Sequence, residues 1–493
     1  MDLTNNLSLS RWYRGKSRPS YEKGGFFVED AEKKGSQNMT LDLSKLQLPT
    51  GEIVIDEKIL KDYGQNKFTQ EKITGSKPAV LIDAKSITDV QATVKFANQE
   101  KIAVTVYGGG TSIVNGSAGE NGGIVLNLTK LNKIIEINTA DQTAVVEAGV
   151  LNGTLDEEVR KQGYFFAPDP GSKPISTVGG NIATNAGGMS SLKYGTTKQS
   201  VLGLKVVLAD GTIVETGGRC FKNNAGYDLT DLFVGSEGTL GVVVEATVRI
   251  LPIPFGNATT GLATFADMKA LSVAVEKISA SGLNPSMLEA LNKTSIEALD
   301  ALEGTDMGKE GAEALLIFQL DVTPEGALEA LKETLEQNKA LHVSVTDDPE
   351  YAKKIVKIRQ DYYKAEAAYG RLVVEDVAVP LSKLPELAEF VDNLSFTSPV
   401  KAFLGGHAGD GNFHPNIAIP KDLDTIPEDV QSAITKIFAF AQSLGGTISA
   451  EHGIGDLKYG WIVSQLGQEV VDLQRKVKQA FDPNNILNPG RKI

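Results

Sequence analysis

Alternation of apolar and polar residues predicts regular elements from about residue 76 onward. Residues 79–83 form a short apolar run typical of a buried strand. Residues 86–99 place Val90, Val94 and Ala97 at helical spacing behind Ser86, a good helix N-cap residue. Further strands are expected at 101–107, 123–128, 134–137, 144–148, 203–208 and 241–250, with a helix at 151–162.

The segment Pro252-Ile253-Pro254 interrupts this pattern and indicates a domain boundary. Two helices packed on one antiparallel sheet beyond it would form a ferredoxin-like cap. Irregular alternation of helices and strands predicts an α+β fold, not a doubly wound sheet. The elements expected there are helices at 268–280, 323–338 and 348–369 and strands at 314–320, 372–379 and 401–404.

Four segments are expected: an arm at 1–50, a first domain at 51–253, a cap at 254–460, and a C-terminal helix and tail at 461–493 packing back on the first domain. Residues 1–40 have no sustained period, so they form either a flexible arm or a partner-binding arm. Their cations and aromatic residues are Arg11, Trp12, Tyr13, Arg14, Lys16, Arg18 and Lys23.

Composition narrows the class of protein. A length of 493 residues favours two or more packed units, and a formal charge of −13 disfavours a nucleic-acid surface. No apolar run approaches the ~20 residues that span a bilayer, and the N-terminus lacks a secretory pattern. We therefore expect a cytoplasmic location, or one peripheral to a membrane. The single cysteine, Cys220, excludes an iron–sulfur cluster on this chain and is expected to be an inert core residue.

Four glycine clusters lie between residues 107 and 241, at 107–112, 168–188, 223–229 and 235–241. Successive glycines let backbone N–H groups converge on an anion and leave room for a pyrophosphate. The first cluster, taken alone, is also typical of a tight turn. It is not the Gly-x-Gly-x-x-Gly fingerprint, so a nicotinamide site is not supported. Four such loops together indicate one long ligand with phosphates and polar rings.

Three of the four histidines fall in two short motifs. Glycines around His407 and before His414 allow both imidazoles to face one point, and Glu451 would complete a set of two histidines and one carboxylate. His452 follows directly. Separate loop histidines bonded to backbone are the alternative, and the residues alone leave a metal site and an acid–base site both open.

These motifs, in this order, resemble the vanillyl-alcohol oxidase/PCMH flavoproteins from about residue 76 to the C-terminus. The likeness is to the branch of D-lactate dehydrogenases, D-2-hydroxyglutarate dehydrogenases and the glycolate oxidase FAD subunit. It implies a two-part PCMH-type FAD-binding domain and an FAD-linked oxidase C-terminal cap. Tyr107 departs from the arginine that the family often has there. The implied cofactor residues are Tyr107, Gly108, Gly109, Gly110, Thr111, Ser112, Pro170, Gly171, Thr177, Gly179, Gly180, Asn181, Thr184, Asn185, Gly187, Gly188, Tyr194, Glu237, Gly238, Gly241, Val242 and Asn488.

The first domain has no histidine, so FAD is expected to be non-covalent. The resemblance further implies that His407, His414 and Glu451 bind a divalent metal (Zn, Mn or Fe) and that His452 is the base. Asn416 and Arg359 would contact the substrate, with Arg359 on its carboxylate. Tyr363 and Arg371 are weaker substrate-binding predictions, and either arginine could equally be a charge on a helix surface.

The resulting hypothesis is an FAD-dependent dehydrogenase that oxidises a small D-2-hydroxy acid, with D-lactate first. Without a cluster on the chain, electrons would pass to an external acceptor such as an electron-transferring flavoprotein, a quinone or a cytochrome. The alternatives are the FAD-binding subunit of a larger glycolate- or lactate-oxidising complex, and a non-redox enzyme of the alkyl-dihydroxyacetone-phosphate synthase type. A homodimer and a complex with electron-transfer subunits both remain open.

Overall fold

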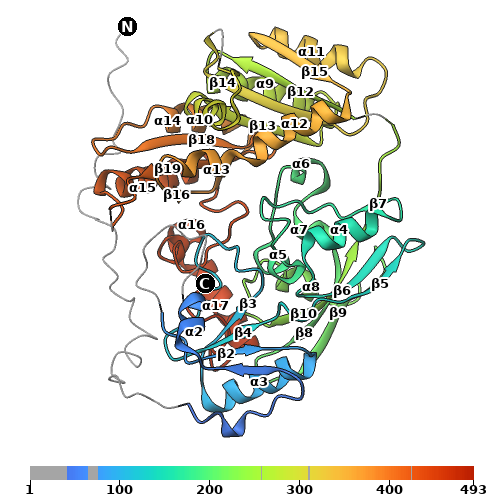
Figure 1. The fold of residues 1–493 in the computed structure, drawn as a ribbon, viewed down its shortest axis with the longest axis vertical. Coiled ribbons are helices and arrows are strands. Elements are labelled where there is room, and N and C mark those ends of the chain that lie inside the picture. Colours follow the sequence, from blue (N-terminus) through green and yellow to red (C-terminus); the bar gives the residue numbers. More distant parts are fainter. Residues whose placement is uncertain (1–40, 65–75, 257, 309–310, 424) are drawn as a thin grey trace. The chain divides into compact units, whose positions relative to one another are not determined.

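The computed structural model describes residues 41–64, 76–256, 258–308, 311–423 and 425–493, and it has an α+β fold (Figure 1). Residues 45–493 form one compact unit. Of the arm predicted at residues 1–50, the part at 1–40, with its cations and aromatic residues, lies outside the described residues. Among the described helices, none is both long and apolar enough to cross a membrane.

The first sheet has the order β1-β2-β4-β3, in which β2, β4 and β3 are parallel and β1 is antiparallel to β2. Its strands are β1 (Glu52–Val54), β2 (Val80–Asp83), β4 (Ile124–Asn127) and β3 (Val104–Tyr107). Helix α3 (Ile87–Glu100) begins as predicted at the N-cap Ser86, which forms a capping box with Asp89. Since β3 ends at Tyr107, the first glycine cluster lies at the carboxyl edge of this sheet.

The second sheet is antiparallel with the order β5-β6-β10-β8-β9. Its strands are β5 (Ile134–Asn138), β6 (Thr143–Glu147), β10 (Val242–Arg249), β8 (Val201–Val207) and β9 (Ile213–Gly217). Side chains alternate between buried and half-buried along β10, so one face packs on the core. Helices α4 (Asn152–Arg160), α5 (Val178–Thr184), α6 (Ser191–Tyr194), α7 (Thr197–Ser200) and α8 (Leu229–Phe233) lie between β6 and β10 in the chain.

The cap is built on one eight-stranded sheet with the order β15-β12-β14-β13-β18-β19-β16, with β17 paired to β19. The first four strands, with α9 (Met268–Ala280) and α11 (Ala327–Gln337), have the predicted ferredoxin-like arrangement. The strands are β12 (Thr259–Phe265), β13 (Met287–Asn292), β14 (Ala314–Leu320), β15 (His342–Thr346), β16 (Arg371–Val374), β17 (Val377–Ala378), β18 (Lys401–His407) and β19 (Asn412–Ile419). The other helices are α10 (Lys293–Glu303), α14 (Leu384–Asp392) and α15 (Glu428–Ser443).

Two predicted cap elements are interrupted. The helix expected at 348–369 is two helices, α12 (Pro349–Gln360) and α13 (Tyr362–Ala367), separated at Asp361. The strand expected at 372–379 is β16 followed by β17, separated by Glu375 and Asp376. Both interruptions lie next to residues of the site described below.

The C-terminal segment packs on the first domain. Phe481, at the end of α17 (Gln468–Phe481), makes an edge-to-face contact with Phe233, with ring centroids 5.5 Å apart. The ammonium of Lys478 donates to the carbonyl oxygens of Thr239 (2.7 Å) and Leu487 (2.8 Å). Asn488 accepts a hydrogen bond from the backbone of Val106, at the end of the first sheet.

Candidate active site

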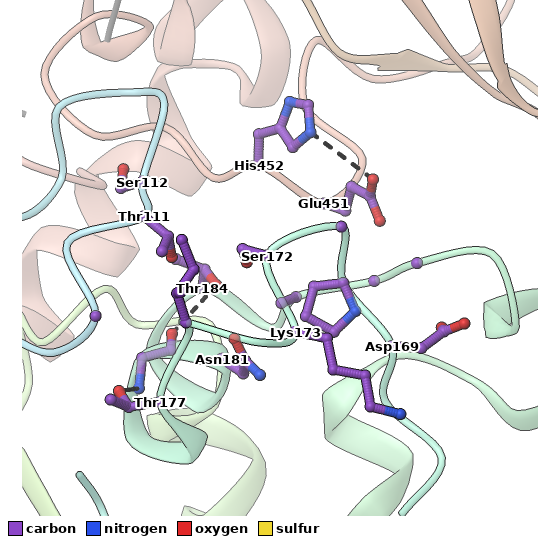
Figure 2. A pocket seen from close by; sticks show the side chains of 18 of the residues that line it. Thr111, Ser112, Asp169, Ser172, Lys173, Thr177, Asn181, Thr184, Glu451 and His452 are labelled. Atoms are coloured by element: carbon purple, nitrogen blue, oxygen red, sulfur yellow. Dashed lines mark hydrogen bonds and ion pairs between the residues drawn. The ribbon is translucent and has the colours of Figure 1, made fainter. Parts of the chain in front are cut away.

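A cavity of about 990 Å³ lies between the glycine loops of the first domain and the β18–β19 hairpin of the cap. This volume is at the upper end of the ~300–1,000 Å³ usual for small-molecule sites. Figure 2 shows residues of α5 on one side and Glu451 and His452 on another. The predicted cofactor residues that line it are Gly108, Gly109, Gly110, Thr111, Ser112, Pro170, Gly171, Thr177, Gly179, Gly180, Asn181, Thr184, Gly187, Gly188, Glu237, Gly238, Gly241 and Asn488.

The first two glycine clusters pack directly against each other. A Cβ added at Gly108 would lie 2.6 Å from Oγ1 of Thr177, and one at Gly109 would lie 2.5 Å from the carbonyl oxygen of Ile175. Thr177 is the N-cap of α5 and accepts a hydrogen bond from the backbone of Gly180. Glycine is therefore required where these loops form one wall of the cavity.

Two buried polar atoms on this wall fit a polar ligand. Nδ2 of Asn181 and Oγ of Ser117 belong to lining residues and have no hydrogen-bond partner within the described part of the chain. Buried polar atoms without a partner are rare in folded proteins. FAD carries phosphates and polar ring edges that would satisfy both, so the residues present fit this cofactor.

Four of the predicted cofactor residues do not line the cavity: Tyr107, Asn185, Tyr194 and Val242. The Tyr107 ring packs edge-on against Tyr63, with centroids 4.7 Å apart. Asn185 accepts hydrogen bonds from Thr196 and Lys198. The Tyr194 hydroxyl donates to the carboxylate of Asp321, which does line the cavity.

Two other predictions for the first domain are wrong. The third glycine cluster, at 223–229, is exposed and does not line the cavity; the side chain of Tyr227 is 96% exposed. Cys220 is also exposed, not a core residue. Both lie between β9 and α8, where the chain runs over the surface.

The histidine motifs meet at one carboxylate oxygen, Oε1 of Glu451. Nε2 of His407 lies 3.2 Å from it, Nε2 of His414 lies 3.5 Å from it, and Nε2 of His452 lies 3.7 Å from it. The β18–β19 hairpin pairs Gly405 with His414, which puts His407 and His414 two positions apart on neighbouring strands. Such positions share one face of a sheet.

Charge is concentrated in this cluster. Burial opposes ionisation of Glu451, but His407 and His414 outweigh it and hold the pKa of Glu451 well below its usual value. Burial likewise opposes protonation of His407, but the carboxylates of Glu289 and Glu451 raise its pKa well above the usual value. Burial is the largest effect on His452; despite the opposing charge of Asp376, its pKa falls to about 4.

The loop carrying Glu451 and His452 is held by Asp376, a buried residue that the sequence analysis missed. Oδ2 of Asp376 accepts hydrogen bonds from the backbone nitrogens of Ala450 (2.8 Å), Glu451 (2.9 Å) and His452 (2.9 Å). Its other oxygen accepts from the Asn412 amide at 2.8 Å. Both oxygens are thus engaged, so Asp376 positions the loop.

A second missed carboxylate, Glu289 on β13, lies behind the cluster. Its Oε1 lies 2.7 Å from Nδ1 of His407, and its Oε2 accepts a hydrogen bond from Nε of Arg359 at 2.5 Å. Arg359 is buried at the end of α12, lines the cavity, and lies with its guanidinium carbon 5.1 Å from the centre of the Tyr362 ring.

The other predicted substrate residues divide into two groups. Asn416 and Tyr363 line the cavity, and the Asn416 amide donates to Glu366 at 2.7 Å. Burial raises the pKa of Glu366 to about 8, against the effects of its neighbours. Arg371 does not line the cavity; its guanidinium donates to the carbonyl oxygen of Leu423.

Sequence signals for the missed carboxylates were present. Glu289 stands alone in an otherwise apolar segment, 287–291. Asp376 follows Glu375 directly after the apolar run 372–374. An acid within or directly after a buried apolar run needs a partner, so each could have been suspected of serving a site.

The donor atoms of the cluster fit a divalent metal. His407, His414 and Glu451 offer ligand atoms within 4.8 Å of one another, and Asp376, His414 and His452 form a second such set. The first set is the better fit, because the Asp376 oxygens already accept five hydrogen bonds. Two imidazoles and one carboxylate leave coordination positions open for a substrate.

A glycine-walled cavity joined to a His/carboxylate cluster fits a flavin-dependent oxidoreductase, and the family matches assign the chain to this class. Residues 78–217 match the family described as "FAD binding domain", and residues 256–492 match "FAD linked oxidases, C-terminal domain". The substrate-bound structure of p-cresol methylhydroxylase has a TM-score of 0.73 at 19% identity, covering 89% of this chain and 93% of that one. This last likeness shows the fold alone.

Similar proteins of known name indicate the branch of the family to which the chain belongs. Glycolate oxidase subunit GlcD of Bacillus subtilis is 35% identical over 427 residues, covering 84% of this chain and 89% of the relative. D-lactate dehydrogenase of Anaerostipes hadrus is 34% identical over 457 residues, covering 89% and 94%. The chain belongs to the FAD-linked oxidoreductases, in their D-lactate, glycolate and D-2-hydroxyglutarate dehydrogenase branch.

Proposed function

We propose that this protein oxidises a small D-2-hydroxy acid, D-lactate first, to the 2-oxo acid and passes the electrons to an external acceptor. The observation that carries the proposal is the convergence of three imidazole Nε2 atoms on Oε1 of Glu451, beside the flavin loops. Arg359 supplies a buried cation in the same cavity. D-lactate dehydrogenases and a glycolate oxidase subunit among the relatives support this substrate class.

Two groups would supply chemistry that side chains lack. The glycine loops would hold FAD, which would provide the hydride acceptor. His407, His414 and Glu451 would hold a divalent metal, which would provide a Lewis acid for the substrate hydroxyl. The protein binds these groups and orients the substrate between them.

Each remaining step falls to a side chain. Arg359 clamps the substrate carboxylate through its terminal nitrogens, because its Nε is engaged by Glu289. His452, whose pKa lies near 4, is neutral at pH 7 and takes the hydroxyl proton on Nε2. Asp376 lies 3.9 Å from Nδ1 of His452 and favours the imidazolium that forms. The side-chain amide of Asn416 is held by Glu366 and lines the cavity, where it contacts the substrate.

The relative named as a subunit of glycolate oxidase favours a second candidate, in which the chain is the FAD-binding member of a larger complex. Both candidates require electrons to leave the chain, since one cysteine cannot hold an iron–sulfur cluster. They differ in whether the isolated chain reacts with the acid.

The testing experiment is an anaerobic absorbance titration of the purified protein with D-lactate, L-lactate, glycolate and D-2-hydroxyglutarate. Stoichiometric loss of the oxidised-flavin band with D-lactate alone supports the proposal. If a different D-acid bleaches the oxidised-flavin band instead, the proposed substrate is wrong and the proposed reaction is supported. A yellow protein bleached by none of the four contradicts the proposal and favours the subunit role.

A further inference from the structure

Glu289 is a charged residue in a strand that otherwise packs the core. Leu288, Ala290 and Leu291 around it are buried, and Glu289 itself is 0% exposed. Burying a carboxylate is costly unless its oxygens are fully paired, and an apolar side chain is often at least as stabilising in such a place. The residue therefore calls for a reason other than stability.

The two oxygens of Glu289 serve two different parts of the site. The β13–β18 register sets Glu289 opposite His407, and Oε1 approaches Nδ1 of that imidazole at 2.7 Å. Oε2 accepts the hydrogen bond from Nε of Arg359 at 2.5 Å. One rigid carboxylate thus joins a proposed metal ligand to the proposed carboxylate-binding cation.

We propose that Glu289 is a positioning residue that couples the metal site to the substrate-carboxylate site; this rests on the function proposed above. By accepting from Nδ1–H, Glu289 reserves Nε2, which lies beside Glu451, as the His407 nitrogen that would bind the metal. Binding Nε of Arg359 fixes the plane of the guanidinium and leaves both terminal nitrogens for the acid. A change at Glu289 should therefore disturb at least one of the two sites, and no neutral replacement can keep both.

Glu289→Gln tests this coupling, because the amide has one acceptor and one donor end. If its oxygen accepts from Arg359, its nitrogen faces Nδ1 of His407 and forces the proton onto Nε2, where the metal binds. If the amide is reversed, its nitrogen faces the Arg359 donor and that pair is lost. Either orientation damages one site, and neither preserves both.

The measurements are binding titrations on the flavin-loaded protein. Co²⁺ affinity and the visible spectrum of the Co²⁺ protein report the His407 site; pyruvate affinity, followed by flavin absorbance, reports the Arg359 site. We expect Glu289→Gln to weaken Co²⁺ binding by roughly 10- to 100-fold, to weaken pyruvate binding by a similar factor, or both. Flavin content and melting temperature report whether the variant is folded.

The matched control is Glu245→Gln. Glu245 is also a strand carboxylate paired with a cation, lying 3.1 Å from Lys205, but Lys205, unlike Arg359 and His407, does not line the cavity. This variant should bind Co²⁺ and pyruvate like the wild type. If Glu289→Gln does not fold, Glu289→Asp replaces it, since the shorter side chain keeps the charge but cannot reach both partners.

The outcomes separate the two proposals. Suppose that D-lactate reduces the flavin of the wild type, and that a folded Glu289 variant binds Co²⁺ and pyruvate as tightly as the wild type does. The proposed role of Glu289 is then wrong, and the proposed function stands. If the wild type binds no Co²⁺, the metal site and the role of Glu289 both fall. Weaker binding in the Glu289 variant alone, with the control unchanged, supports the coupling.

Discussion

The carboxylate of Glu237 lies 2.7 Å from the backbone nitrogen of Gly455 and accepts its hydrogen bond. Its other oxygen accepts from the backbone of Ile454 at 2.8 Å. Glu237 belongs to the glycine loop at 235–241, and Gly455 follows His452 by three residues. A residue predicted to contact the cofactor thus ties the flavin side of the cavity to the loop that carries the proposed base.

Glu237→Gln should lower the turnover number while keeping FAD. An amide can accept only one of the two backbone hydrogen bonds, so the His452 loop shifts relative to the flavin. Displacements of about 1 Å in such sites cost up to ~10²-fold in rate, and we expect a 10- to 100-fold loss. Steady-state kinetics with flavin content as the control measures it; unchanged turnover would show that the loop is held by other contacts.

His452→Ala should retain FAD and lose turnover by ~10²–10⁴-fold, the usual contribution of a positioned base. The matched control is His342→Ala, because His342 is exposed on β15 and does not line the cavity. Stopped-flow reduction of the flavin by D-lactate separates this step from electron transfer to the acceptor. A His452 variant that is reduced at the wild-type rate would contradict the assignment.

Arg359→Lys and Arg371→Lys should behave differently. Lysine keeps the charge but loses the bidentate geometry and the Nε bond to Glu289, so the KM for D-lactate should rise at least tenfold in the Arg359 variant. Arg371 donates to the carbonyl oxygen of Leu423 and does not line the cavity, so its variant should keep the KM within about twofold. An equal rise in KM in the two variants would show that Arg371 also binds the substrate.

Removal of the metal should silence the enzyme reversibly. Dialysis against a chelator should abolish reduction of the flavin by D-lactate, and Zn²⁺ or Mn²⁺ should restore it, because mixed imidazole and carboxylate sites accept several divalent ions. The His407→Ala variant, treated in parallel, should not recover. Full activity in protein shown by elemental analysis to be metal-free would remove the ion from the reaction.

Glu366 predicts a pH dependence of stability. Burial raises its folded pKa from 4.5 to about 8, so between these values the unfolded chain releases a proton that the folded chain keeps. The contribution of Glu366 to the free energy of unfolding therefore falls as pH rises through this window. Glu366→Gln cannot ionise, so its stability relative to the wild type should increase from pH 4.5 to 8 and then level off. Denaturant titrations across this range measure the free energy of unfolding of both proteins. A difference between them that does not change with pH would contradict the prediction.

The periodicity of apolar residues predicted several elements closely, because the residues that it expects to be buried are buried in the folded protein. The helix expected at 268–280 is α9, and the strand expected at 314–320 is β14. Strand β19 was missed, although all eight of its residues are buried. Its sequence includes Asn412, His414, Pro415 and Asn416, a poor strand pattern, and its stability comes from pairing with β16, β17 and β18.

Some residues of the site could likewise be predicted from the sequence, and others could not. His407, His414, Glu451 and His452 could be found because histidine is scarce in this sequence. Glu289 and Asp376 could not be assigned, since their roles depend on strand register and on backbone N–H groups more than 70 residues away. The cluster at 223–229 shows the reverse error, in which a suitable composition lies on the surface.

The hydrogen bond between the backbone of Val106 and Asn488 joins residues 382 positions apart. At the usual 5–20 residues per second of translation, the ribosome makes Asn488 roughly 20 to 80 s after Val106. This part of the cavity lining is therefore incomplete for most of the time taken to synthesise the chain. A nonsense mutation even a few codons before Asn488 would yield a chain in which the Val106 side of the cavity lacks its partner.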